Sequence, residues 1–402
     1  MKYVVILGDG MSDYPQKELN NFTPLELAKK PFIDGLIKNS LMGKCKTVPS
    51  GMKPGSDVAN LSVLGYNVKE CYTGRSPLEA ASIGIVLKDT DVTLRANLVT
   101  VSNEEIYEDK TMIDYSAGEI STLEAKELIA YLKEHLDSEE FKLYAGISYR
   151  HCLVIDNGEL INELTPPHDI TGKKVLGHLP TSKTGLKYLG LMKKSYELLK
   201  GHPINLERIK NGKNPANSLW FWGEGTKPNL QNFEERYGLK GGMISAVDLL
   251  KGIAKINGMK VIEVEGATGN YDTNFMGKAQ ACINALKSGL DFVYVHMEAP
   301  DECGHHGDAK NKIYSIEKID EVVLKVVSGL KELGEDYKIL ICPDHPTPLN
   351  IKTHASDPVP FVIYDSRNVY SCKESAYTEK CAENTGVMVE SGEELMKIFL
   401  EK

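Results

Sequence analysis

Short apolar runs bounded by turn residues recur along the chain and define its pattern. They are YVVIL at 3–7, CLVI at 152–155, FVYVHM at 292–297, KILICP at 338–343 and FVIY at 361–364. Because hydrophobicity is continuous within each run, the runs are typical of strands that are covered on both faces, as in a parallel sheet. Segments with helical spacing separate several of them, at 248–258, 277–289 and 315–333. The alternation predicts an α/β fold with a doubly wound, mostly parallel sheet.

The stretch from residue 72 to 212 follows a different pattern, in which strand-like runs mix with polar loops and a helical segment at 122–136. This mixture predicts a smaller α+β domain inserted into the α/β core. We therefore expect the first part of the core at 1–71, the inserted domain at 72–212 and the second part of the core at 213–402.

The composition limits the classes of protein and partner. Hydrophobic residues make up 42% and charged residues 26% of the 402 positions, as in folded globular proteins. The net charge of -9 comes without a long basic run, so nucleic acid is not an expected partner. The cysteines form no CxxC pair, which favours a reducing compartment.

The N-terminal stretch MKYVVILGDG reaches glycine and aspartate too soon to form the core of a signal peptide. No segment approaches the roughly 18 uncharged apolar residues of a membrane span. We therefore expect a cytoplasmic protein with no membrane partner, and the sequence leaves a homo-oligomer open.

Three of the apolar runs lead to an aspartate. VVILGD reaches Asp9, VYVHMEAPD reaches Asp301 and ILICPD reaches Asp344. The carboxyl ends of parallel strands face one crevice, so these carboxylates are expected to converge there. Crowded carboxylates repel one another and need cations nearby. A lone aspartate after a strand is usually a turn or cap residue, but capping does not explain three coincidences.

Histidines accompany these aspartates. His305 follows Asp301 by four residues, His345 follows Asp344 directly, and the stretch KTHASDPVPF adds His354. Mixed carboxylate and imidazole ligands suit Mn, Zn or Co better than Mg alone, and a set of this size predicts two divalent metal ions. Two further histidines are weaker candidates: His296, which is expected to pack or to support a ligand, and His306.

Ser56 stands at the head of a helical pattern in VPSGMKPGSDVANLSVLGY, after residues that force a turn. The free N–H groups of a helix N-terminus stabilise a phosphate or an anionic nucleophile. An ordinary N-cap serine is the structural alternative. The nearby metal ligands favour a nucleophile, because a metal lowers the pKa of a coordinated hydroxyl.

Ordered motifs spread over nearly the whole chain resemble a known family. GDGMSD, PSGMKPGSDVANLSVLGY, YTGRSPLEA, ATGNYDTNFMGKA, EAPDECGHHGD, CPDHPTP and KTHASDPVPFVIYD are similar to the archaeal-type cofactor-independent phosphoglycerate mutases of the alkaline phosphatase superfamily. The resemblance implies an alkaline-phosphatase-type core with an inserted substrate-binding or lid domain. It also implies interconversion of 3-phosphoglycerate and 2-phosphoglycerate through a phosphoserine, with two divalent metals, most often manganese, and without 2,3-bisphosphoglycerate.

The resemblance implies a role for each matching residue. One metal would be held by Asp9, Ser56, Asp344 and His345, and the other by Asp301, His305 and His354. Ser56 would accept the phosphoryl group, and Lys278 resembles a lysine that stabilises it during transfer.

Candidate substrate groups lie in the inserted domain. His151 in SYRHCLV matches a histidine close to the transferred phosphate, and Arg150 stands beside it. Arg75 and Arg95 offer bidentate forks for phosphate or carboxylate, although each could instead form a surface salt bridge. His168 and Asp169 in PPHDITG either face the substrate or form an ordinary turn.

The chain differs from the longer bacterial mutases in two ways. The resemblance therefore supports the metal chemistry more strongly than the identity of the substrate. The chain reads PTP after His345, and the inserted domain lacks their arginine-rich motifs. A homoserine kinase-like phosphotransferase of the same superfamily and a metal-dependent phosphomonoesterase therefore stay open as alternatives. Ser56 argues against a non-catalytic metal protein, since a structural site gains little from a hydroxyl ligand.

Overall fold

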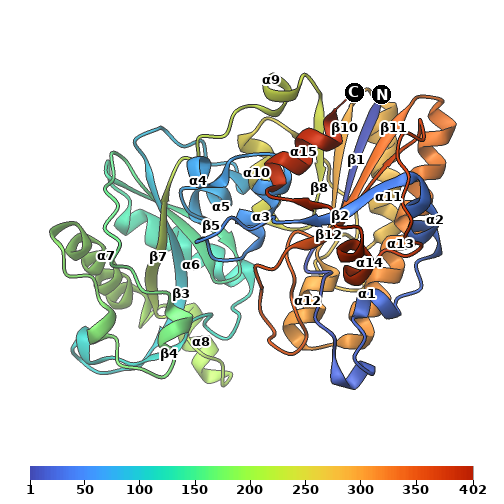
Figure 1. The fold of residues 1–402 in the computed structure, drawn as a ribbon. Helices are drawn as coiled ribbons and strands as arrows, with labels where there is room; N and C mark the ends of the chain where they lie inside the picture. The colour runs from blue at the N-terminus through green and yellow to red at the C-terminus, as the bar shows by residue number, and fades with distance from the viewer. Residues whose placement is uncertain (402) are drawn as a thin grey trace. The chain divides into compact units, whose positions relative to one another are not determined.

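The computed structural model describes residues 1–401, which form two compact units (Figure 1). We call residues 1–72 and 229–401 the core unit, and Thr73–Pro228 the inserted unit. None of the described helices is long and apolar enough to cross a lipid bilayer.

An eight-stranded sheet lies at the centre of the core unit, in the order β13-β2-β12-β11-β1-β10-β8-β9. Only β12 runs antiparallel to its neighbours. The predicted doubly wound, mostly parallel sheet is therefore confirmed. The strands are β1 (Lys2–Gly8), β2 (Ser40–Cys45), β8 (Gly241–Ile244), β9 (Lys260–Val261), β10 (Phe292–Met297), β11 (Tyr337–Cys342), β12 (Val359–Asp365) and β13 (Met388–Val389).

Helices cover both faces of this sheet, which explains why its strands are apolar without alternation. In β1, Val4 and Ile6 join the hydrophobic cluster that includes residues of α13 (Ala309–Leu333), whereas the ring of Tyr3 lies 5.6 Å from that of Phe399 in α15 (Gly392–Leu400).

One face carries α1 (Pro24–Leu27), α2 (Pro31–Leu36), α11 (Phe275–Lys287), α13 (Ala309–Leu333) and α14 (Glu379–Asn384). The other carries α3 (Ser56–Val63), α10 (Asp248–Ile256) and α15 (Gly392–Leu400) (Figure 1). The remaining helices of the core unit are α4 (Val68–Cys71), α9 (Phe233–Tyr237) and α12 (Ala299–His306), with 3-10 turns at Lys17–Leu19 and Ile37–Asn39.

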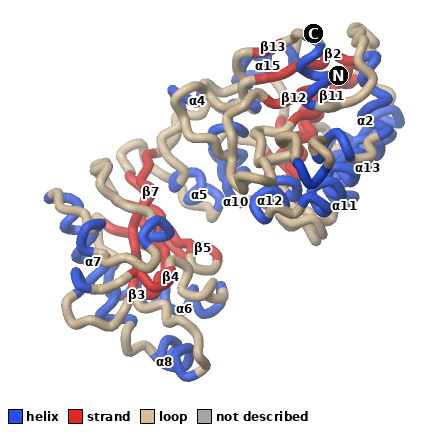
Figure 2. The backbone as a smooth tube through the Cα atoms, turned by 60° about the horizontal axis from the view of Figure 1, so that its bottom comes forward, coloured by secondary structure: helices blue, strands red, loops and turns tan. Residues whose placement is uncertain are grey.

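The inserted unit contains a five-stranded antiparallel sheet in the order β4-β3-β6-β5, with β7 also paired to β3 (Figure 2). Helices α6 and α7 pack on one face, and α5 packs on the other. The strands are β3 (Val92–Val101), β4 (Met112–Asp114), β5 (Phe141–Ile147), β6 (Arg150–Ile155) and β7 (Ser218–Thr226). The helices are α5 (Ser76–Ser82), α6 (Thr122–Leu136), α7 (Lys183–Leu199) and α8 (Pro203–Lys210), with 3-10 turns at Tyr107–Asp109, Pro167–Ile170 and Leu176–His178.

The inserted unit extends beyond the boundary predicted at residue 212. It ends at Pro228, because β7 pairs along the length of β3 and so belongs to the inserted sheet. At the other boundary the unit begins at Thr73, one residue after the predicted start.

Three neighbouring parallel strands, β11, β1 and β10, position the predicted metal ligands. β1 lies between the other two, with Gly8 beside Met297 of β10 and Leu7 beside Cys342 of β11. The segments that follow these strands therefore begin at one edge of the sheet, which is where open α/β sheets bind ligands.

Candidate active site with two metal-ligand clusters

The Asp9 cluster consists of Asp9, Asp344 and His345, which follow β1 and β11. The Nε2 atom of His345 lies 3.5 Å from Oδ1 of Asp9 and 3.3 Å from Oδ2 of Asp344. All three side chains are buried, and Oδ1 of Asp9 has no hydrogen-bond partner among the described residues. A buried carboxylate oxygen without a partner is costly, so a cation suits this position.

The Asp301 cluster consists of Asp301, His305 and His354. Asp301 and His305 are four residues apart and share one face of α12, which follows β10. Nε2 of His305 lies 3.2 Å from Oδ2 of Asp301 and 3.0 Å from Nε2 of His354. Within each cluster the ligand atoms are less than 4.8 Å apart, and such mixed nitrogen and oxygen donors suit a divalent cation.

The three histidines of these clusters direct Nε2 inward and have an outer oxygen near Nδ1. Metal-binding histidines commonly donate their second N–H in this way, which sets the tautomer. When these rings are neutral, their Nε2 lone pairs are therefore available to divalent cations. The outer oxygens are the carbonyl of Lys352 for His305 at 3.1 Å, the carbonyl of Pro54 for His354 at 3.4 Å and the hydroxyl of Thr347 for His345 at 3.2 Å.

Burial and neighbouring carboxylates determine the electrostatics of the clusters. Burial, followed by the charges of Asp344 and Asp301, raises the pKa of Asp9 well above its usual range. Burial opposes ionisation of Asp301 as well, but hydrogen bonds with His305 and His354 outweigh it and hold its pKa well below the usual range. A cation in the Asp9 cluster would relieve the repulsion between its carboxylates.

Ser56 is the first residue of α3, and its hydroxyl lies beside the Asp9 cluster. Its Oγ is 3.3 Å from Nε2 of His345. The N-cap position belongs to Gly55, so Ser56 is not the capping serine of the structural alternative. The helix N-terminus and the cluster thus meet at this hydroxyl, an arrangement suited to an anionic nucleophile or a phosphate ester.

Lys278 lies in the first turn of α11, and its side chain is fully buried in the core unit. Its Nζ donates a hydrogen bond to the carbonyl of His296 at 3.0 Å. Burial lowers the pKa of Lys278 to about 8. The ammonium group is therefore mostly present at pH 7, but it loses its proton at a much lower pH than that of a surface lysine.

Two supporting residues, Asn60 and Thr347, were not predicted from the sequence. Asn60 donates to Oδ2 of Asp344 at 2.8 Å and follows Ser56 by one helical turn, a spacing that places both on one helix face. Thr347 donates to Oδ1 of Asp301, and no sequence spacing links these residues. His296 was predicted to pack or to support a ligand, and its Nε2 lies 2.7 Å from Oδ2 of the ligand candidate Asp9.

The inserted unit brings most of its candidate residues into one cluster. Glu79 forms ion pairs with the Nε atoms of both Arg75 and Arg95, at 2.8 Å and 2.9 Å. The guanidinium of Arg95 lies 4.0 Å from the ring centre of Trp222, and the ring of His168 packs edge-on against the same tryptophan. The salt bridges considered for the arginines are therefore present, and they hold two cationic groups side by side.

Arg150 and Asp169 lie at the margin of this cluster. Arg150 stacks on Tyr149, which contacts Tyr115, and Tyr115 in turn contacts His168. Asp169 is exposed and lies 3.6 Å from the His168 ring.

His151 lies on the opposite face of the inserted sheet from this cluster. Directly paired residues of antiparallel strands share a face, and His151 pairs with Ala96 in the core beneath α6 and α7. Burial lowers the pKa of His151 to about 3, and its Nε2 has no partner among the described residues. The structure therefore does not join His151 to Arg150, because consecutive strand residues point to opposite faces.

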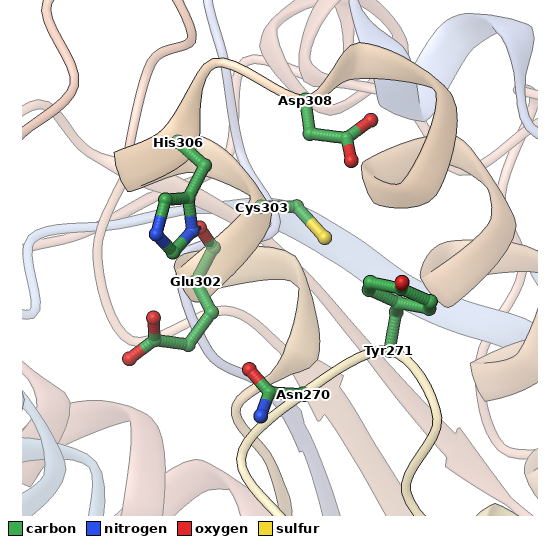
Figure 3. Close-up of a pocket in the computed structure, with 6 residues that line it drawn as sticks. All are labelled: Asn270, Tyr271, Glu302, Cys303, His306 and Asp308. Carbon is green, nitrogen blue, oxygen red and sulfur yellow. Dashed lines mark hydrogen bonds between the residues drawn. The ribbon is translucent and has the colours of Figure 1, made fainter.

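A small cavity of about 200 Å³ lies beside α12 (Figure 3). By their helical spacing, the α12 residues that line it share a different face of the helix from Asp301 and His305. His306 lines this cavity and is not a member of either ligand cluster. This agrees with the expectation that His306 is a weaker candidate for a metal ligand than His305. The lining residues are Asn270, Tyr271, Glu302, Cys303, His306 and Asp308.

Comparison with known proteins relates the chain to named relatives. The profile of the 2,3-bisphosphoglycerate-independent phosphoglycerate mutase family matches residues 38–205. The chain is 47% identical to the 2,3-bisphosphoglycerate-independent phosphoglycerate mutase of Methanosarcina barkeri, over the full length of both proteins. It is 46% identical, again over both full lengths, to the probable enzyme of the same name from Geobacter sulfurreducens.

Two solved structures share the fold. A Pyrococcus horikoshii protein is 31% identical with a TM-score of 0.83, covering 99% of this chain and 96% of its own. The cofactor-independent phosphoglycerate mutase of Thermoplasma acidophilum is 26% identical with a TM-score of 0.67, covering 100% of this chain and 99% of its own. The kinase and phosphomonoesterase alternatives are not favoured, since the curated relatives named above are mutases.

Proposed function

The chain belongs to the family of 2,3-bisphosphoglycerate-independent phosphoglycerate mutases, and from this premise we propose that it interconverts 3-phosphoglycerate and 2-phosphoglycerate in the cytoplasm. The position of Ser56 carries the proposal: its Oγ lies at a helix N-terminus, 3.3 Å from a histidine of a buried carboxylate cluster. A hydroxyl in these surroundings is suited to accept and return a phosphoryl group.

Two divalent cations, manganese in our proposal, would be held by residues of the core unit. Asp9, Asp344, His345 and Ser56 would hold one, and Asp301, His305 and His354 the other. When bound, the metals would neutralise phosphoryl charge and lower the pKa of the serine hydroxyl. The unpartnered Oδ1 of Asp9 and the inward Nε2 atoms of the histidines support this assignment.

Ser56 takes part in two reciprocal transfers. In the first, a bond forms between its Oγ and phosphorus while the bond from phosphorus to the 3-oxygen of the substrate breaks. The proton lost by the serine is balanced by the one gained at that oxygen. Glycerate then turns, its 2-oxygen attacks the phosphoserine, and the proton returns to Ser56. Lys278, when protonated, would stabilise the charge on the transferring group.

We propose that the inserted unit binds the glycerate and limits access of water. Arg75 and Arg95, held side by side by Glu79, present guanidinium groups suited to a carboxylate or a phosphate. Arg150 and His168 would add further contacts. Exclusion of water matters because a phosphoserine that meets water is hydrolysed, which turns a mutase into a phosphatase.

An enzyme-coupled assay tests the proposed reaction. The purified full chain, loaded with Mn²⁺, is incubated with 3-phosphoglycerate in the absence of 2,3-bisphosphoglycerate, and excess enolase reports 2-phosphoglycerate. Turnover is expected. Ser56→Ala protein, purified in the same way, measures any contaminating mutase. A folded, metal-loaded chain that forms no 2-phosphoglycerate would contradict the proposal.

The protonation of Lys278 predicts how the rate depends on pH. Since burial lowers its pKa to about 8, the ammonium is lost as the pH rises through that value, and kcat/KM should fall there. Lys278→Arg keeps a positive charge and should move this alkaline limb to higher pH. The measurement is kcat/KM against pH with enolase in excess at every point.

Lys287→Arg provides the matched control, because Lys287 is on the same helix but exposed. Its alkaline limb should coincide with that of the wild type. If the limb also stays unchanged in Lys278→Arg, another group sets it.

A further inference from the structure

Thr347 connects the two ligand clusters through its side chain. Its Oγ1 donates a hydrogen bond to Oδ1 of Asp301 and lies 3.2 Å from Nδ1 of His345. Asp301 belongs to one cluster and His345 to the other. A single buried hydroxyl therefore contacts a ligand candidate from each.

The hydrogen bonds of Thr347 with His345 and Asp301 allow one consistent assignment of donors and acceptors. Nε2 of His345 faces Ser56 and the Asp9 cluster, so a neutral ring that offers its Nε2 lone pair there carries its proton on Nδ1. Nδ1–H then donates to Oγ1 of Thr347, and the single hydroxyl proton of Thr347 remains for Asp301. The hydroxyl thus sets the tautomer of one ligand and orients the carboxylate of the other.

The backbone of Thr347 is held on two sides. Its N–H donates to the carbonyl of Ser12 at 3.2 Å, and its carbonyl accepts from Nζ of Lys312 at 2.8 Å. Lys312 forms an ion pair with Asp13 at 2.7 Å, and both side chains are fully buried. This network ties the loop after β11 to the loop after β1 and to α13.

The glycine at position 10 makes room for the connection. A Cβ atom there would lie 2.5 Å from Oγ1 of Thr347 and 2.6 Å from Oδ1 of Asp301, both closer than atoms normally approach. Gly10 also has a φ of +59°, which other residues rarely adopt. The close approach of these groups is thus built into the loop after β1.

We propose that Thr347 is a positioning residue that couples the two clusters, so that filling one with a divalent cation strengthens binding at the other. The coupling follows from the shared hydroxyl. A cation bound by Asp301 would favour the carboxylate orientation that accepts from Thr347, and the hydroxyl oxygen would then remain the acceptor for His345. The inference rests on the metal-holding role proposed above for the clusters.

The test is an isothermal calorimetric titration of the chelator-treated full chain with Mn²⁺. The wild type is expected to bind two ions cooperatively. Thr347→Val removes the hydroxyl at nearly equal volume and should weaken binding by about 10- to 100-fold and abolish the cooperativity, as loss of a group that orients a metal ligand commonly does. Thr347→Ser, which restores the hydroxyl, should remain within about threefold of the wild type.

Two further variants separate a positioning role from a general structural one. Thr353→Val makes the same change at an exposed threonine next to His354 and should leave binding unchanged. Thr347→Ala removes the hydroxyl without the added methyl group, in case valine disturbs folding, and should behave like Thr347→Val. The metal-free forms of all variants are expected to unfold at similar temperatures.

The outcomes distinguish this inference from the proposed function. Wild-type protein that binds two ions, together with valine and alanine variants that bind them equally well, would overturn the role of Thr347 and leave the metal sites standing. Wild-type protein that binds no Mn²⁺ would overturn both.

Discussion

Replacing Ser56 with alanine should abolish mutase turnover while leaving the fold and the metal content nearly unchanged. The hydroxyl is the only group of this residue that can accept the phosphoryl group, and its removal should lower kcat on the order of 10⁴-fold or more. Folding should tolerate the change, because Gly55 holds the N-cap position and the Ser56 side chain makes no capping bond. The measurements are the enolase-coupled rate, the unfolding temperature and the bound metal per chain.

Ser50→Ala makes the same chemical change six residues earlier, at an exposed position. It should retain full activity. Brief incubation of the wild type with substrate, followed by acid quenching and mass spectrometry, should reveal a phosphoryl group on the peptide that contains Ser56. Substantial turnover by Ser56→Ala would rule out the phosphoserine mechanism.

Removing the metals with a chelator should reduce turnover on the order of 10³-fold or more, because the charge on the transferring phosphoryl group would lose several kcal/mol of stabilisation. Adding Mn²⁺ back should restore activity. It should also raise the unfolding temperature, because an ion that binds only the folded chain stabilises it. Burial and neighbouring carboxylates, which raise the pKa of Asp9, show how unfavourable the charged cluster is by itself.

Two variants on α12 test whether the loss of activity on metal removal depends on Asp301. Asp301→Asn removes a carboxylate that contacts both histidines of its cluster and should lower Mn²⁺ affinity and activity together. Glu302→Gln changes the next residue, whose side chain lines the cavity beside α12, and should alter neither (Figure 3). Full activity in thoroughly metal-free protein would contradict the two-metal proposal.

Four of the five apolar runs form core strands, namely β1, β10, β11 and β12, whereas the run at 152–155 forms β6 of the antiparallel inserted sheet. Strands covered on both faces need apolar residues at every position, and this requirement is visible in a single sequence. The carboxyl ends of parallel strands meet at one edge whatever the order of the strands, so Asp9, Asp301 and Asp344 could be placed together without coordinates. The structure brings each of them into a cluster with histidines.

Strand pairing decided what the sequence left undetermined in the inserted unit. The segment of β7 follows the boundary predicted at residue 212, yet it pairs with β3, a partner more than 100 residues earlier in the chain. Likewise, His151 and Arg150 are neighbours in the sequence but point to opposite faces of β6. A sequence shows that the two residues alternate, but not which face the helices cover.

The sequence by itself determined the alternation of strands and helices, the end of the sheet that carries the ligands and the residue types available there, because these depend on local periodicity. Only the tertiary structure decided which distant residues hold the two ligand clusters in place. Thr347 contacts Asp301, 46 residues away, and Lys312 reaches Asp13, 299 residues away. Such contacts depend on the packing of distant segments, and no local pattern in the chain encodes them.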